Sequence, residues 1–65
     1  MTPRLTAAQR IVKQHGGVHN TGKRFDRASG LLKEAAERLA DALRAANYQV
    51  RGIVLVKGDH EVIYA

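Results

Sequence analysis

Apolar residues recur at intervals of three and four between positions 25 and 47, and this pattern constrains the fold more than any other feature. They fill roughly half of a helical wheel and comprise Phe25, Ala28, Leu31, Leu32, Ala35, Ala36, Leu39, Ala42, Leu43 and Ala46. The spacing predicts an amphipathic helix from Phe25 to Asn47. Glycine inside a helix costs up to about 1 kcal/mol relative to alanine, so Gly30 makes a start as late as Ser29 the alternative. So wide a stripe predicts burial on more than one side.

A shorter helix is expected near the N-terminus. Thr2, which precedes a proline, has the pattern of an N-cap, and Thr6 with Gln9 three residues later has the pattern of a capping box. With either start, we expect the helix to end at His15, because two glycines follow and supply the left-handed residue that commonly closes a helix. Residues 16–24 are rich in glycine, asparagine and threonine without periodicity, which predicts a loop.

The C-terminal residues have the composition of a β-hairpin. Two β-branched and aromatic runs, 53–56 and 62–64, flank Gly58-Asp59, which is a two-residue turn of the glycine-first type. This turn would pair Leu55 with Val62, Val54 with Ile63, and Ile53 with Tyr64. The middle of the hairpin is then apolar on both faces. One face packs on the helices, and the other needs a cover.

These elements predict one α+β domain over residues 1–65: a short N-terminal helix, a long central helix and a C-terminal antiparallel β-hairpin. A chain of 65 residues without cysteine has neither a disulfide nor a thiolate zinc site to stabilise so small a core. A second copy of the chain is the simplest partner that could bury the remaining apolar face of the hairpin. We therefore expect a homo-oligomer with Val54, Val56 and Ile63 at its interface.

The net charge of +5 is concentrated in the N-terminal part of the chain. Residues 1–27 contain six basic side chains and one acid, whereas residues 28–65 contain five of each. A local excess of positive charge is typical of proteins that contact nucleic-acid phosphates. The leading hypothesis is a small basic nucleic-acid-associated protein, an accessory or regulatory factor that binds DNA or RNA through Gln9, Arg10, Lys13, Lys23, Arg24 and Arg27. The connection between the helices is too long for a helix-turn-helix.

The competing hypothesis is a homodimeric protein-interaction module, an adaptor or inhibitor that works through the apolar hairpin without contacting nucleic acid. Its working surface would be an exposed apolar patch. The first five residues lack the apolar run of a signal peptide, and no run is long enough to span a membrane. We therefore expect a cytoplasmic protein with no membrane partner.

Motifs for chemistry are weak. Residues 17–23 match G-x-x-x-x-G-K, but a helix precedes them where a phosphate-binding loop has a strand, and Arg24 follows where that loop has serine or threonine. His15 and His19 have a metal-like spacing that the intervening glycines break. Ser29 is the only serine, and no acid is predicted in a pocket beside a histidine. We expect no enzyme activity, no cofactor and no metal.

Overall fold

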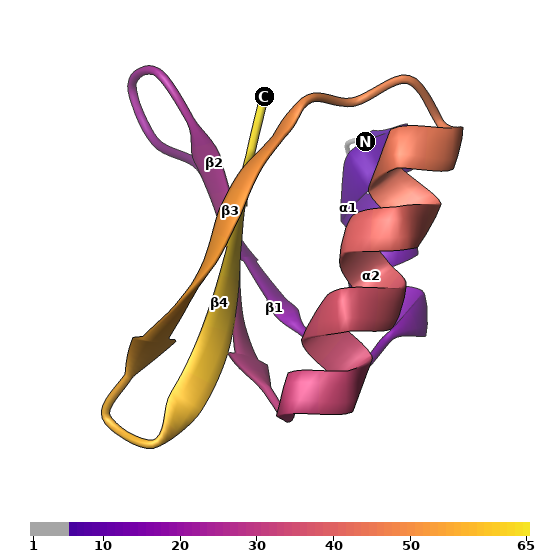
Figure 1. Ribbon diagram of the computed structural model, residues 1–65. Coiled ribbons are helices and arrows are strands. Elements are labelled where there is room, and N and C mark those ends of the chain that lie inside the picture. Colours follow the sequence, from indigo (N-terminus) through magenta and orange to yellow (C-terminus); the bar gives the residue numbers. More distant parts are fainter. Residues whose placement is uncertain (1–5) are drawn as a thin grey trace, which may run out of the picture.

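The computed structural model describes residues 6–65, which form two helices and one four-stranded sheet (Figure 1). In chain order the elements are α1 (Ala7–Gln14), β1 (Val18–Asn20), β2 (Asp26–Leu31), α2 (Lys33–Ala45), β3 (Val50–Val56) and β4 (Asp59–Tyr64). The predicted α+β class is confirmed. The prediction that strands occur only in a C-terminal hairpin is wrong, because β1 and β2 precede the second helix.

The sheet has the order β1-β2-β4-β3, and every neighbouring pair is antiparallel. Both helices lie on the same side of it (Figure 1). We call the opposite side, which neither helix covers, the open face. β1 and β3 are the edge strands, so the C-terminal hairpin is the outer half of a larger sheet.

The first helix agrees with the capping-box prediction. The Thr6 hydroxyl accepts from the Gln9 backbone N–H, and the Gln9 side chain accepts from the Thr6 N–H. The helix closes at His15, as predicted, and Gly16 follows with φ 80°. The alternative cap, Thr2, lies outside the described residues.

The predicted helix from Phe25 to Asn47 is correct only in its second part, because residues 26–31 form β2. Ala28 and Leu31 are both buried on the helix side although they are three positions apart. An irregularity in the pairing with β4 between these residues makes this possible, and Gly30 adopts φ 72° there. An extra residue in a strand therefore imitates the spacing of a helical face. A start at Ser29 is equally wrong.

The predicted loop over residues 16–24 contains β1, which pairs with β2 through Val18↔Ser29, His19↔Ala28 and Asn20↔Arg27. Three residues are too few to show a period of two, so the pattern gave no signal for this strand.

The C-terminal hairpin is present with a different turn. Lys57 and Gly58 form it, both with positive φ (51° and 85°), so the turn is of type I′. Leu55 consequently pairs with His60, Val54 with Glu61 and Ile53 with Val62, and the three predicted pairs are wrong. The shift is two residues, so each side chain of β3 keeps its predicted face.

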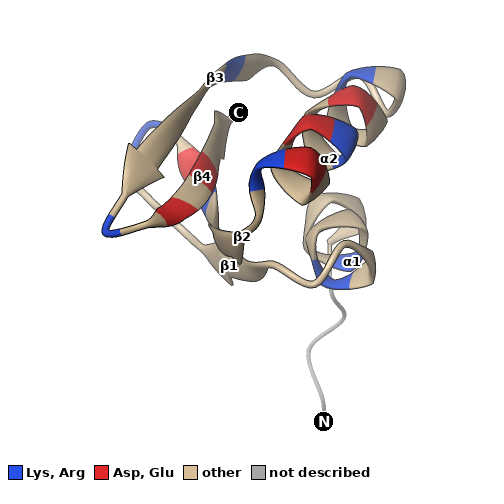
Figure 2. Cartoon of the chain, turned by 60° about the horizontal axis from the view of Figure 1, so that its bottom comes forward, with Lys and Arg blue, Asp and Glu red and all other residues tan. Residues whose placement is uncertain are grey.

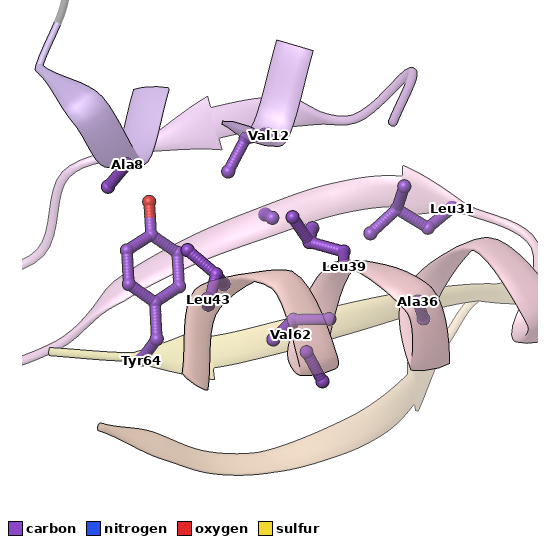
Figure 3. Close-up of a cluster of buried hydrophobic side chains, with 10 residues drawn as sticks. Ala8, Val12, Leu31, Ala36, Leu39, Leu43, Val62 and Tyr64 are labelled. Atoms are coloured by element: carbon purple, nitrogen blue, oxygen red, sulfur yellow. The ribbon is translucent and has the colours of Figure 1, made fainter. Parts of the chain in front are cut away.

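The core lies between the sheet and the helices (Figure 3). α2 contributes Ala36, Leu39, Ala40 and Leu43 to it. The remaining buried residues come from α1 and the two central strands, and they are Ala8, Val12, Ala28, Leu31, Val62 and Tyr64. Within residues 6–65, none of these core side chains lies on the open face.

Candidate functional site

Side chains directly opposite in an antiparallel sheet point to the same side, so the pairing register identifies the residues of the open face. Ala28 and Val62 face the helices, and their neighbours in the two central strands, Arg27 and Ile63, therefore face away. The row across the open face runs Asn20, Arg27, Ile63 and Gly52.

Four cations gather at one end of this face, and we call Lys23, Arg24, Arg27 and Arg51 the basic patch. An open hollow of about 540 Å³ is lined by Lys23, Arg24 and Arg27 together with Asn20, Thr21, Gly22, Phe25 and Ile63. Arg51 joins from β3, since its guanidinium carbon lies 5.2 Å from the centre of the Phe25 ring. The patch thus combines cations with an aromatic ring and an aliphatic floor.

The turn between β1 and β2 is held tightly. The Gly22 N–H donates to Asp26 Oδ1 at 3.3 Å. A Cβ at position 22 would overlap the Phe25 carbonyl oxygen, so no other residue fits this conformation. The close approach of Gly22 to Phe25 fixes where Lys23 and Arg24 lie relative to Arg27.

The basic patch has no acidic partner among residues 6–65. The contacts there between basic and acidic side chains are the Arg44–Asp41 ion pair on α2 and the approach of His19 to Asp26 on the helix side of the sheet. The acids Asp59 and Glu61 lie towards the other end of the open face, opposite Val56 and Val54. On α2, by contrast, basic and acidic residues are mixed (Figure 2). The patch is therefore free to attract an anion.

The carboxylate nearest to the patch is directed inward. Asp26 pairs with Tyr64, and its Oδ2 lies 3.6 Å from His19 Nε2. The side chain of His19 is only 14% exposed, and its ring centre lies 6.0 Å from that of Tyr64. Asp26 is therefore part of a semi-buried polar cluster on the helix side.

Gln9 is engaged within the protein. Its carbonyl oxygen accepts from the Thr6 N–H at 2.8 Å, which leaves its amide nitrogen to face His19 Nδ1 at 3.4 Å. Because that nitrogen can only donate, Nδ1 accepts, and the proton of neutral His19 is on Nε2, towards Asp26. A ligand would have to break these contacts to use the Gln9 amide.

The remaining predicted residues of α1 lie apart from the basic patch. Lys13 lines a second hollow of about 370 Å³ with Gln9, Val12, Gly17, Val18 and His19. Arg10 is exposed on the same helix and lines neither hollow. The two hollows share no lining residue but both adjoin β1, because Asn20 lines the first, and Val18 and His19 line the second. The predicted binding residues thus form two groups at the β1 edge.

The charge distribution along the sequence does not indicate Arg51, and Phe25, the one aromatic residue of the basic segment, is not among the predicted site residues. Arg51 belongs to the half of the chain whose charges cancel, and the topology brings it beside the N-terminal cations. Phe25 was counted in the apolar stripe of a helix. Correct pairing of β2 with β4 would have been needed to find both.

The three predicted interface residues lie on two different strands. Val54 and Val56 lie on the open face of the edge strand β3, whereas Ile63 belongs to the central strand β4 and lines the hollow of the basic patch. Ile63 is therefore a neighbour of Arg27.

Comparison with known proteins gave no match to a family model, a curated protein or a solved structure. Within residues 6–65, no helix is long and apolar enough to cross a membrane. The same residues contain no cluster of three or more side chains suited to hold a metal ion. Geometry and charge are the basis for a functional assignment.

Proposed function

We propose that this protein binds single-stranded nucleic acid through the basic patch on the open face. The observation that supports it is the gathering of Lys23, Arg24, Arg27 and Arg51 around Phe25 on a face that no helix covers. The phosphate backbone contributes most of the affinity in such complexes, and cations without acidic partners are suited to contact it.

A single strand fits this surface better than a duplex. Proteins that bind single strands combine a positive groove with aromatic rings on which unpaired bases stack. The hollow combines the Phe25 ring and the Ile63 side chain with the cations. Neither helix of residues 6–65 lies on this face to enter a major groove. Lys13, near the β1 edge, would extend the phosphate path beyond the sheet.

Salt dependence tests the proposal. Anisotropy of labelled single-stranded DNA and RNA of random sequence should show binding that weakens with salt, with a slope of log affinity against log salt of about −3 for four phosphate contacts. The double variant Lys23→Ala/Arg24→Ala should reduce the magnitude of the slope by about 1.4. Phe25→Leu should cost about 1–3 kcal/mol of binding to a single strand through lost stacking.

A matched control removes two charges elsewhere. Lys33→Ala/Arg38→Ala changes the net charge equally, on the mixed-sign surface of α2, and should leave the slope unchanged. The proposal is wrong if micromolar protein retains neither DNA nor RNA at about 50 mM salt, where even non-specific binders are detectable. Equal slopes for the two double variants would show attraction by net charge rather than by the patch.

The alternative hypothesis, a protein-interaction module, has separate support in the exposed apolar residues of β3. These lie away from the hollow of the basic patch, so the two surfaces are compatible in one molecule.

A further inference from the structure

The free edge of β3 is apolar and exposed. Ile53, Val54, Leu55 and Val56 are 37%, 38%, 67% and 37% exposed, and they are consecutive. Ile53 and Leu55 lie on the helix side of the sheet, and Val54 and Val56 lie on the open face. Among residues 6–65, no strand pairs with this edge, and side chains on both faces of the strand are partly exposed.

Natural edge strands are usually protected by charge, proline, a bulge or short length. The other edge strand, β1, is only three residues long. In β3 the protective features lie at the ends, namely the irregularity between Val50 and Gly52 and the charge of Lys57. The four residues between them have no such feature. A strand of this kind is suited to pair with another strand.

We propose that two copies of this chain pair antiparallel through β3, with Leu55 opposite Leu55 of the second copy. In a two-residue hairpin the residues that flank the turn form a hydrogen-bonded pair, and bonded and non-bonded pairs then alternate. Val56 and Val54 therefore bond to β4, whereas Ile53 and Leu55 direct their N–H and C=O groups to the free edge. A two-fold axis at Leu55 lets the Leu55 groups of the two copies bond to each other, and it sets Ile53 opposite Lys57 of the turn.

Charge selects this register among the possible ones. Two chains of net charge +5 repel each other, so the contact must set no cation opposite another cation, and here Lys57 lies opposite the uncharged Ile53. With the axis at Leu55, Arg51 of one copy lies about 27 Å from Arg51 of the other along the strands, well beyond the screening length of physiological salt. An axis at Val54 would instead set Arg51 opposite Lys57, which is destabilising.

The pairing also has a consequence for nucleic-acid binding. This consequence rests on the proposed function, whereas the pairing itself does not. The two-fold axis of an antiparallel pair is normal to the sheet, so both copies turn the same face in the same direction. Eight strands would then form one sheet, with four helices on one side and two basic patches on the other. A single strand long enough could contact both patches.

The oligomeric state tests the pairing without nucleic acid. Sedimentation should give a mass twice the 7.1 kDa of one chain, and Leu55→Lys should shift the population towards the monomer. Val18→Lys, an equal charge change at a 61% exposed residue of the other edge strand, should leave the dimer intact. Circular dichroism checks that both variants fold. A monomeric wild type at several hundred micromolar, a particle larger than a dimer, or equal effects of the two variants would overturn the proposal.

The absence of cysteine provides a second test that does not depend on weakening the contact. Leu55→Cys introduces one thiol, and the Cα atoms of a hydrogen-bonded antiparallel pair are about 5.5 Å apart, within disulfide range. Mild oxidation should convert Leu55→Cys to a covalent dimer and leave Val18→Cys largely monomeric. Equal rates of cross-linking would mean that random collision, not β3 pairing, brings the chains together.

Discussion

At the residue scale, the buried Tyr64 makes the stability of the fold depend on pH in the alkaline range. Its side chain is fully buried in the core, and its hydroxyl points toward Ala8 (Figure 3). Burial, with the nearby Asp26 carboxylate and then Tyr48 as smaller causes, raises the pKa of Tyr64 from 10.0 to about 12. The folded protein thus keeps the phenol proton in a range where the unfolded chain releases it. The contribution of protonated Tyr64 to the unfolding free energy should be fully present below pH 10 and should be lost as the pH rises from 10 to 12.

Tyr64→Phe removes the titrating group and keeps the ring. Denaturant unfolding of this variant should depend less on pH between 10 and 12 than that of the wild type, because the remaining basic groups titrate in both. Tyr48→Phe, the same change in the only other tyrosine, is the control and should follow the wild type. Parallel pH curves for Tyr64→Phe and the wild type would contradict the role of burial.

At the scale of the element, α2 is stabilised by the buried side chains on the face that packs on the sheet. Leu39 is completely buried, whereas Leu32, the residue before the helix, is 77% exposed. Leu39→Ala should cost about 2–5 kcal/mol through lost burial and the cavity that remains, a large fraction of the stability of so small a domain. Leu32→Ala removes the same atoms from the surface and should change the unfolding free energy by less than about 0.5 kcal/mol. Urea unfolding of both variants measures the difference, and similar losses would show that α2 does not pack as described.

The elements also show what the sequence pattern can reveal. The capping box at Thr6 is a local feature that agrees with the structure, and the helix predicted from Phe25 to Asn47 agrees with it over 33–45. β2 was assigned to the helix because its irregularity spaces Ala28 and Leu31 as a helix would. β1 was too short to give a pattern. Local spacing therefore predicts helices here, whereas the strands depend on pairing between distant residues.

The same distinction applies to the candidate site: the residues that are close in sequence were predicted, and those that the sheet brings together were not. Lys23, Arg24 and Arg27 follow from the charge count, and they do line one hollow. The position of Arg51 over Phe25 depends on bringing β3 beside β4 and β4 beside β2, which no local pattern contains. Gln9 is predicted both to cap α1 with Thr6 and to bind nucleic acid, and its contact with His19 depends on the fold around α1.

At the scale of the whole molecule, edge pairing and the basic patch together predict a dependence on ligand length. A strand that reaches only one patch binds each copy independently, whereas a strand that spans both gains from the high effective concentration of the second patch. Affinity of the wild type for single strands of increasing length should therefore rise abruptly at one length. Leu55→Lys should bind short strands as the wild type does or slightly better, because it adds a positive charge, and it should lack the abrupt rise. Val18→Lys, with the same added charge, should retain it. A smooth increase with length for all three proteins would mean that the two patches do not act on one strand.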